Sequence, residues 1–274
     1  MRSPARTQRV RRVHACLIHF GDRQMNISIA LVNCSGNVGK TTLTRELFAP
    51  RLPGMPVRQI ESINADEADL AHRGGDVQVM IAGQFDELHE ELMQGRAFLV
   101  DIGASNVEEY LRRLDEASGL QEDYGFFVVP AVPDRKQLQD TLKTIDLLTD
   151  LGVEPERIRV VLNQVVVERN ETVEVSVGRA FAPLLELHRR GGHFMLDTSA
   201  VVPKSDVFSL AAELGTTLHA LCRDETDYRA AIAAATDSGE RVRLSRRRIL
   251  QSKARSISPK LDAVFEAVMR ETVA

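Results

Sequence analysis

The sequence has few cysteines and no long apolar run, and each scarcity excludes a class of protein. Its three cysteines, Cys16, Cys34 and Cys222, lie far apart and form neither a CxxC pair nor the spacing of a zinc site. This cysteine usage is typical of a reducing compartment, so we expect a cytoplasmic protein. No apolar run approaches the about 20 residues that a membrane helix needs. His188 and His193 lack helical metal-ligand spacing, and internal repeats and low-complexity segments are absent from the sequence.

The net charge of −4 conceals two basic segments in an otherwise acidic chain. Residues 1–24 hold six arginines and one acid, and residues 241–260 hold six arginines, two lysines and no acid. The remaining residues are therefore strongly acidic. Clustered positive charge is the usual footprint of polyanion binding, so any contact with nucleic acid is expected from these segments.

Residues 1–24 show no clean periodicity, and two interpretations of them stay open. Met25 directly precedes a strand-like run over residues 27–32, which favours Met25 as the true start and residues 1–24 as upstream sequence. The alternative is a basic N-terminal arm. A secretory signal is not expected, because the apolar stretch is short and is interrupted by His14 and His19.

Strand-like and helix-like stretches alternate from about residue 26 to about residue 220. We expect strands over residues 26–33, 57–63, 97–102, 125–132, 158–163 and 193–197. We expect helices over residues 39–48, 84–94, 106–117, 134–150, 177–190, 206–222 and 225–236. This alternation predicts an α/β fold, a mainly parallel sheet with helices on both faces. The expected organisation is an extension over residues 1–24, a domain over residues 25–223 and a helical, Arg-rich tail over residues 224–274.

The segment NCSGNVGKTT, residues 33–42, has the form of a phosphate-binding loop. Gly36 and Gly39 allow the backbone to turn tightly and to aim its amides inward. Lys40 is expected to reach the β- and γ-phosphates of a nucleotide, and the Thr41 hydroxyl to ligate Mg²⁺. The standard pattern has Gly at the position of Cys34, but the preceding strand and the following helix compensate. The candidate nucleotide-binding residues of the loop are Ser35, Gly36, Asn37, Val38, Gly39, Lys40, Thr41 and Thr42. The alternative is a Gly-rich turn without a ligand.

A candidate acid for the metal side of the site follows a second apolar strand. Four apolar residues over 97–100 end in Asp101, which is expected to hold Mg²⁺ through water. The backbone N–H of Gly103, two residues later, is expected to meet the γ-phosphate. The alternative is that Asp101 caps the next helix.

On these residues the chain resembles the deviant P-loop ATPases of the ParA/MinD group. The segments NCSGNVGKTTLTRELFAPRL and VDIGASN are most similar to StbB-type plasmid stability proteins. The likeness spans about residues 26–220, and the loop is its most specific part. The resemblance implies a P-loop NTPase fold, ATP and Mg²⁺ as cofactors, and ATP hydrolysis.

The resemblance also implies roles for single residues. Lys40, Asp101 and Glu61 match catalytic positions, and Glu61 ends the strand over residues 57–60. Asn163 matches an asparagine that contacts adenine in this group, and Pro203 matches a backbone segment that packs around the base. As alternatives, Asn163 is a turn residue at a strand end and Glu61 is a surface acid.

The chain departs from the ParA pattern at positions that matter for catalysis. Ser35 stands where the group has a lysine that reaches the partner's nucleotide across a dimer, and Asn37 replaces the second glycine. Arg45 or another basic residue could substitute for that lysine. One carboxylate follows the second strand where two are typical, with Asp66 or Glu67 as replacements. We therefore expect slow or partner-stimulated hydrolysis.

Residues 241–255, RVRLSRRRILQSKAR, predict a helix with a basic face. One interpretation is contact with DNA or a partner through phosphate-type interactions without sequence preference. The other is a solvated helix that pairs with the acidic body. Residues 260–270 predict an amphipathic helix that packs on the body or a partner rather than on a membrane. The candidate DNA or partner contacts are Arg241, Arg243, Arg246, Arg247, Arg248, Lys253 and Arg255.

Together these features favour a ParA-like ATPase for plasmid stability, acting in partition or positioning and potentially in conjugative transfer. Its expected partners are a second copy in an ATP-dependent homodimer, a small DNA-binding adaptor protein and nonspecific DNA, in a bacterial cytoplasm at the nucleoid or plasmid. One alternative is a small-molecule kinase or ligase of the same fold. Another is a nucleotide-binding scaffold with little hydrolysis.

Overall fold

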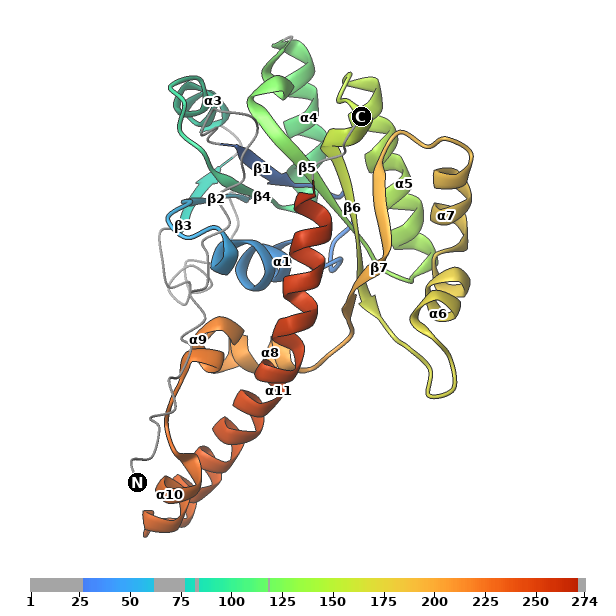
Figure 1. Cartoon of the computed structure of the whole chain (residues 1–274). Coiled ribbons are helices and arrows are strands. Elements are labelled where there is room, and N and C mark those ends of the chain that lie inside the picture. Colours follow the sequence, from blue (N-terminus) through green and yellow to red (C-terminus); the bar gives the residue numbers. More distant parts are fainter. Residues whose placement is uncertain (1–26, 62–76, 82–83, 118, 271–274) are drawn as a thin grey trace, which may run out of the picture.

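The computed structural model describes residues 27–61, 77–81, 84–117 and 119–270. In these residues seven strands form one parallel sheet in the order β3-β2-β4-β1-β5-β6-β7 (Figure 1). The strands are rich in β-branched and aromatic residues, and β1, β2, β4, β5 and β6 are buried on both faces, as expected for a parallel sheet. The edge strands β3 and β7 are more exposed. Their bounds are β1 (Ser28–Leu31), β2 (Val57–Glu61), β3 (Val77–Ile81), β4 (Leu99–Ile102), β5 (Tyr124–Ala131), β6 (Ile158–Val165) and β7 (Met195–Pro203).

Strand register brings the candidate site residues to one edge of the sheet. Leu31, the last residue of β1, pairs with Asp101 in β4 and with Val128 in β5. On the next strand, Gln59 of β2 pairs with Asp101. The loop that follows β1 therefore leaves the centre of the sheet beside the ends of β4 and β2.

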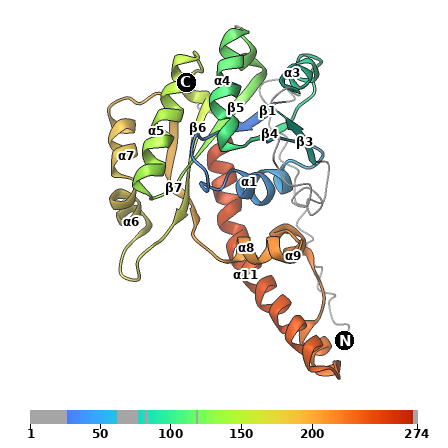
Figure 2. The same cartoon turned by 180° about the vertical axis from the view of Figure 1, so that it is seen from behind.

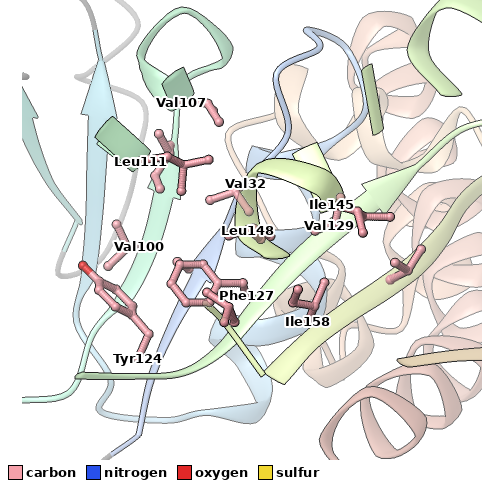
Figure 3. Packing of buried hydrophobic residues seen from close by; sticks show 14 of the residues in the cluster. Val32, Val100, Val107, Leu111, Tyr124, Phe127, Val129, Ile145, Leu148 and Ile158 are labelled. Atoms are coloured by element: carbon pink, nitrogen blue, oxygen red, sulfur yellow. The ribbon is translucent and has the colours of Figure 1, made fainter. Parts of the chain in front are cut away.

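One face of the sheet is covered by five helices of the described residues (Figure 2). Figure 3 shows part of this core, in which Val32, Val100 and Phe127 of the strands meet Leu111 and Leu148 of the helices. The helices are α3 (Phe85–Met93), α4 (Val107–Glu116), α5 (Arg135–Asp150), α6 (Val173–Ala180) and α7 (Ala182–Arg189). Three 3₁₀ turns, η4 (Ala104–Asn106), η5 (Leu120–Asp123) and η6 (Pro155–Arg157), complete this side.

The other face is covered by the helix after the phosphate loop and by the C-terminal helices. The short helix α1 (Lys40–Leu43) continues into a π-helical turn η1 (Thr44–Phe48) and a 3₁₀ turn η2 (Ala49–Arg51). Against them pack α8 (Val207–Glu213), α9 (Leu218–Arg223) and the second half of α11 (Ser238–Met269). Phe48 and Phe265 meet edge to face with ring centroids 6.0 Å apart.

Two charged side chains fasten the helix after the phosphate loop to these C-terminal helices. The buried Glu46 accepts the N–H of Leu218 at 2.8 Å, and burial raises the pKa of this carboxyl. Arg51 donates to the Asp262 carboxylate at 2.6 and 2.9 Å and to the Leu47 carbonyl at 2.9 Å. The C-terminal half of α11 is thus packed into the same body as the sheet and the helix after the loop.

The first half of α11 lies outside this body. Together with α10 (Tyr228–Ala234), residues 238–249 of α11 extend away from the sheet, and we call this segment the arm (Figure 1). Buried positions on α11 begin only at Leu250. Before that residue, Val242 is 50% exposed and Ile249 is 57% exposed. Among the described residues, no helix is long and apolar enough to cross a membrane.

The expected parallel sheet with helices on both faces is confirmed, and most element boundaries agree within two residues. The prediction was wrong in five places, one of which is the end of β7, which continues to Pro203 instead of stopping at residue 197. It missed β3, a five-residue strand too short to show a clear period. The helix expected over residues 177–190 is divided into α6 and α7. The helix expected over residues 206–222 is divided into α8 and α9, between which lies Gly215 with a φ of 59°. The basic segment and the final amphipathic helix are one helix, because the exposed Pro259 does not end it. Residues 1–24, Asp66 and Glu67 lie outside the described residues.

The two halves of α11 predict different responses to the same substitution. Val264 is 1% exposed in the body and Val242 is 50% exposed in the arm. Val264→Ala should lower the free energy of unfolding by about 2 kcal/mol, because it leaves a cavity in a packed core. Val242→Ala removes the same atoms from an exposed helix position and should change it by less than about 0.5 kcal/mol. Chemical denaturation of both variants measures this, and equal effects would contradict the described packing of α11.

Candidate nucleotide-binding site

The phosphate loop has the backbone shape of an anion-binding nest. Asn37 and Gly39 have positive φ values of 59° and 89° within a loop that runs into α1. Alternation between left- and right-handed conformations makes successive backbone N–H groups converge. A Cβ on Gly39 would lie 2.4 Å from Nδ2 of Asn163, so the loop and the end of β6 are in close contact here.

Side chains from three directions hold the carbonyl groups of this loop. Lys40 is buried, and its Nζ donates to the carbonyls of Asn33 and Ser35, both at 2.9 Å. Three amide side chains bind the next three carbonyls: Gln137 that of Gly36 at 2.8 Å, Gln164 that of Asn37 at 3.0 Å and Asn163 that of Val38 at 2.8 Å. With its carbonyls engaged in this way, the loop is free to direct its N–H groups to a bound anion.

Asn33 anchors the start of the loop to the neighbouring strand and helix. Its amide donates to the Pro130 carbonyl of β5 at 2.8 Å and to the Thr141 hydroxyl of α5 at 2.9 Å. Its Oδ1 accepts the N–H of Ser35 at 2.7 Å, and Thr144 accepts the N–H of Cys34 at 3.0 Å. The loop is therefore held in shape by buried and partly buried polar contacts, which specify one arrangement when all of them are satisfied.

Lys40 carries a cation in this buried position. Desolvation lowers the pKa of its amine, and the nearby carboxylates of Asp101 and Glu61 oppose that shift. An amine close to two carboxylates at the mouth of a nest is the charge arrangement that a polyphosphate with a divalent cation would complete.

The acidic side of the site lies on β4 and β2. Asp101 is 2% exposed in β4, and Glu61 ends β2 on the same face of the sheet as Gln59. Gln59 is also buried and donates from Nε2 to Oε1 of Glu61 at 2.6 Å. A Cβ on Gly103 would lie 2.8 Å from Oε2 of Glu61, so this carboxylate is confined on two sides.

The expected role of the Gly103 amide does not fit this arrangement. Its N–H donates to the carbonyl of Ile60 at 2.8 Å, so it belongs to the contact between β4 and β2. The Asn106 side chain donates to the same carbonyl at 3.4 Å. The sequence showed the glycine but not the direction of its N–H, which depends on the neighbouring strand.

A cavity of about 330 Å³ adjoins the loop between α1, the ends of β6 and β7, and α8. Asn163 and Pro203, the two residues assigned to the base from the resemblance, both line it beside Thr41 and Thr42. Gln164, Lys204 and Phe208, which the sequence analysis did not assign, also line it. The structure thus brings Asn163 and Pro203 to the phosphate loop across more than 120 positions of sequence.

Arg45 and Ser35 occupy positions that bear on the missing lysine. Arg45 lines the same cavity, where its Nε donates to Glu46 at 2.8 Å and its Nη2 to the Phe208 carbonyl at 3.4 Å. Ser35 is only 8% exposed, and both its N–H and its carbonyl are used within the loop. Ser35 carries no charge, and the Arg45 guanidinium is bound within the chain. Neither residue therefore supplies a free cation.

The residues of α5 that hydrogen-bond to the loop were not predicted, although their spacing along that helix is visible in the sequence. Gln137, Thr141 and Thr144 lie at i, i+4 and i+7 on the first turns of α5, which places them on one helical face. Leu138, Ile145 and other apolar residues of that helix are buried in the core. A polar stripe beside a buried apolar stripe was therefore visible in the sequence, but its partner was not.

The basic residues assigned to DNA or a partner divide into two groups. Arg243, Arg246 and Arg248 are exposed on the arm and make no hydrogen bond or ion pair within the described residues. The other four contact the chain itself: Arg241 binds the Ala235 carbonyl, Arg247 and Arg255 contact Asp224, and Lys253 pairs with Asp206 at 2.7 Å. Within the part of the chain that the structure describes, the arm thus carries three free cations, whereas the other four assigned residues, on the arm and near the body, contact groups of the chain.

Mg²⁺ would depend on few protein ligands in this site. Thr41 is exposed at the start of α1, and Asp101 lies at the end of β4 beside the loop. Within the described ranges, no three His, Cys, Asp or Glu side chains gather into a metal site. The donor set fits Mg²⁺, which usually binds one or two protein oxygens together with waters and substrate phosphates.

Two glycines of the loop predict opposite responses to alanine. Gly39→Ala should lower the melting temperature clearly, since φ is 89° and the new Cβ would contact the Asn163 amide. Gly36→Ala meets no atom within 4 Å and should leave the melting temperature nearly unchanged. Thermal unfolding of the nucleotide-free protein is the measurement. Equal melting temperatures for the two variants would show that the loop does not have this backbone.

No family model and no curated protein sequence matches the chain. Among solved structures, an ATP complex of a Cyanothece McdA variant aligns over 91% of this chain and 99% of its own, with a TM-score of 0.52 and 14% identity. The Pyrococcus furiosus cell division ATPase MinD covers 84% of this chain and 99% of its own, with 15% identity and a TM-score of 0.44. The pNOB8 ParA structure covers 88% of this chain and 98% of its own, with 13% identity and a TM-score of 0.45. The McdA similarity, together with the strand order, shows that the chain has the P-loop NTPase fold of ParA/MinD-type proteins, with a helical C-terminal tail.

Proposed function

We propose that the protein binds ATP with Mg²⁺ and acts as a ParA-like positioning ATPase. The observation that carries this proposal is the phosphate loop, whose carbonyls are held by Lys40, Gln137, Gln164 and Asn163 so that its N–H groups are available. An N–H nest at the start of a helix is the arrangement by which P-loop proteins bind polyphosphates. The McdA variant that shares the fold was solved with ATP, which agrees with this ligand.

The proposed ATP lies with its phosphates on the loop and its adenosine in the adjoining cavity. Asn163 uses one amide hydrogen for Val38 and one oxygen lone pair for Gln164, so one donor and one acceptor position remain for the base. Pro203 and Phe208 supply apolar walls. Thr41 and, through water, Asp101 hold Mg²⁺, while Glu61 lies on the side where the attacking water is expected.

Hydrolysis is proposed to be slow or stimulated by a partner. The transition state of phosphoryl transfer is stabilised by positive charge placed where negative charge develops. Lys40 supplies one such charge, but Ser35 is buried and Arg45 is bound to Glu46 and Phe208. A second charge would therefore come from another molecule.

The proposed output of the cycle is location. An ATP-dependent homodimer, a small DNA-binding adaptor and nonspecific DNA would let the protein hold a plasmid in place, as in StbB-type plasmid stability, partition or conjugative transfer. The protein would then act in the bacterial cytoplasm, at the nucleoid or the plasmid. The exposed arginines of the arm favour this proposal over a small-molecule kinase or ligase. A scaffold that binds ATP with little hydrolysis is favoured by Ser35 and stays the second candidate.

Removal of the Lys40 amine tests the nucleotide site. Lys40→Ala should abolish ATP binding, because it removes the cation at the nest and releases the carbonyls of Asn33 and Ser35. Lys143→Ala is the matched control, since Lys143 is exposed on α5 and pairs with Glu108. Titration calorimetry with ATP and Mg²⁺ measures both. Unchanged ATP affinity in Lys40→Ala would refute the assignment.

The same samples distinguish the two candidate functions. We expect ATP with Mg²⁺ to shift the mass of the protein from monomer toward dimer or a DNA-bound species, with low turnover in the protein alone. ATP binding without any change in mass or DNA affinity would favour the scaffold. Rapid turnover without a partner would contradict the proposed slow hydrolysis.

The arm is proposed to contact DNA through phosphates. Arg243, Arg246 and Arg248 should each release counterions on binding, so binding should weaken steeply with salt. Changing all three to alanine should weaken binding and reduce the slope of log affinity against log salt by about 2 to 3. A control that changes Arg112 on α4 and Arg189 and Arg190 at the end of α7, each of which pairs with a glutamate of the same helix, removes the same charge. Fluorescence anisotropy with duplex DNA across a salt series measures the slope, and an equal loss in the control would contradict a site on the arm.

A further inference from the structure

A second cavity lies at the opposite end of the sheet from the phosphate loop. It has a volume of about 420 Å³ and lies between the amino ends of β6 and β7 and the last turn of α11. Arg159, Asp197 and Arg270 provide its charged groups. Apolar side chains, among them Met195 and Val268, form much of the remaining wall. The proposed ATPase cycle uses none of these residues.

Arg159 is a buried cation without a counter-ion among the residues that the structure describes. Its residue is 6% exposed, and its guanidinium carbon lies 4.8 Å from the centroid of the Phe126 ring. Its Nε is fully buried without a hydrogen-bond partner, and the side chain forms no ion pair within the described residues. Burial lowers the pKa of this guanidinium, and the charge of Glu156 opposes the shift. A buried charge that lacks a partner destabilises a fold, so its presence calls for a ligand or a compensating group.

Another arginine in the same sheet shows how this chain completes such a position. Arg58 is the second residue of β2, as Arg159 is the second residue of β6. It is 7% exposed and stacks on Phe98 at 4.4 Å, and its Nε also lacks a partner. Its Nη2, however, donates to the Glu91 carboxylate at 3.0 Å. The two sites differ in that a carboxylate from a covering helix is present at Arg58, whereas Arg159 faces the cavity.

The acid in the cavity wall does not take this place. Asp197 accepts hydrogen bonds from the N–H and hydroxyl of Ser199 at 2.9 and 2.6 Å. It also interacts with the Ala200 N–H and with Arg270, whose Nη1 lies 3.6 Å from Oδ2. Asp197 is therefore engaged at the rim, and Arg159 stays the unpaired cation in the interior.

We propose that this cavity binds a small molecule with a carboxylate group, which pairs with Arg159 as Glu91 pairs with Arg58. The planar guanidinium matches a carboxylate in a two-point contact, and stacking on Phe126 fixes its plane. Met195 and Val268 receive the apolar part of the ligand. A volume of about 420 Å³ is within the range of small-molecule sites.

Butyrate is the probe, and thermal unfolding is the first readout. A saturable rise in melting temperature with sodium butyrate, absent with sodium chloride at the same ionic strength, is expected for the parent protein. The experiment is repeated in Lys40→Ala, so that binding at the phosphate loop is removed and failure of the ATP proposal does not affect the result. Inorganic phosphate is the comparison anion in the same background.

Arg159→Met identifies the site. Methionine fills the space of the apolar stem and removes the unpaired charge, so this variant should melt at the same or a higher temperature without ligand. Its response to butyrate should be lost. Arg58→Met is the matched control, which should melt lower because it removes the buried ion pair with Glu91 and leaves that carboxylate only the more exposed Arg96, and it should keep the butyrate response.

Three results would overturn the proposal. The first is the absence of any saturable response at concentrations that fill a millimolar site. The second is an equal butyrate response in the parent and in Arg159→Met. The third is an Arg159-dependent response to phosphate but not to butyrate, which would assign the cavity to a different anion.

Discussion

The contacts that hold the phosphate-loop carbonyls are the constraint on which the site depends. A backbone that directs several N–H groups toward one point must turn its carbonyls elsewhere, and buried carbonyls need donors. Lys40, Gln137, Gln164 and Asn163 supply these donors from α1, α5 and β6. The sheet order β4-β1-β5-β6 places β5 and β6 on one side of the end of β1, so the loop depends on contacts from elements far apart in the sequence.

The same loop is connected to the far end of the molecule through the helix that follows it. Glu46 and Arg51, on the π-helical and 3₁₀ turns after α1, bind Leu218 of α9 and Asp262 of α11. A π-helical turn inside a helix is uncommon and frequently marks a functional site. Residues 238–249 of the arm belong to α11, the helix whose second half packs against the turns after α1. A partner contact that depends on the nucleotide would need such a connection.

Charge is distributed in keeping with separate tasks for the body and the arm. Carboxylates near the loop, Asp101 and Glu61, lie where a metal and phosphates would balance them. Cations near the body are paired, as Lys253 is with Asp206, whereas Arg243, Arg246 and Arg248 on the arm are exposed. Arg159 is the exception, a cation buried in the body without a counter-ion in the described residues. Its position far from the loop separates the proposed carboxylate site from the ATP site.

The sequence by itself determined the parallel α/β class, the phosphate loop and the strand-end Asp101, because each depends on local periodicity or on a short run of residues. The strand β3 was missed because five residues are too few to show a clear period. The sequence pattern predicted the basic segment and the final amphipathic helix as separate elements, whereas α11 continues through Pro259. Only the tertiary structure decided what each candidate touches. The bonds from Asn33 to Pro130 and Thr141 span 97 and 108 positions, and that from Asn163 to Val38 spans 125. Such pairings follow from strand order and register, which no single stretch of sequence encodes.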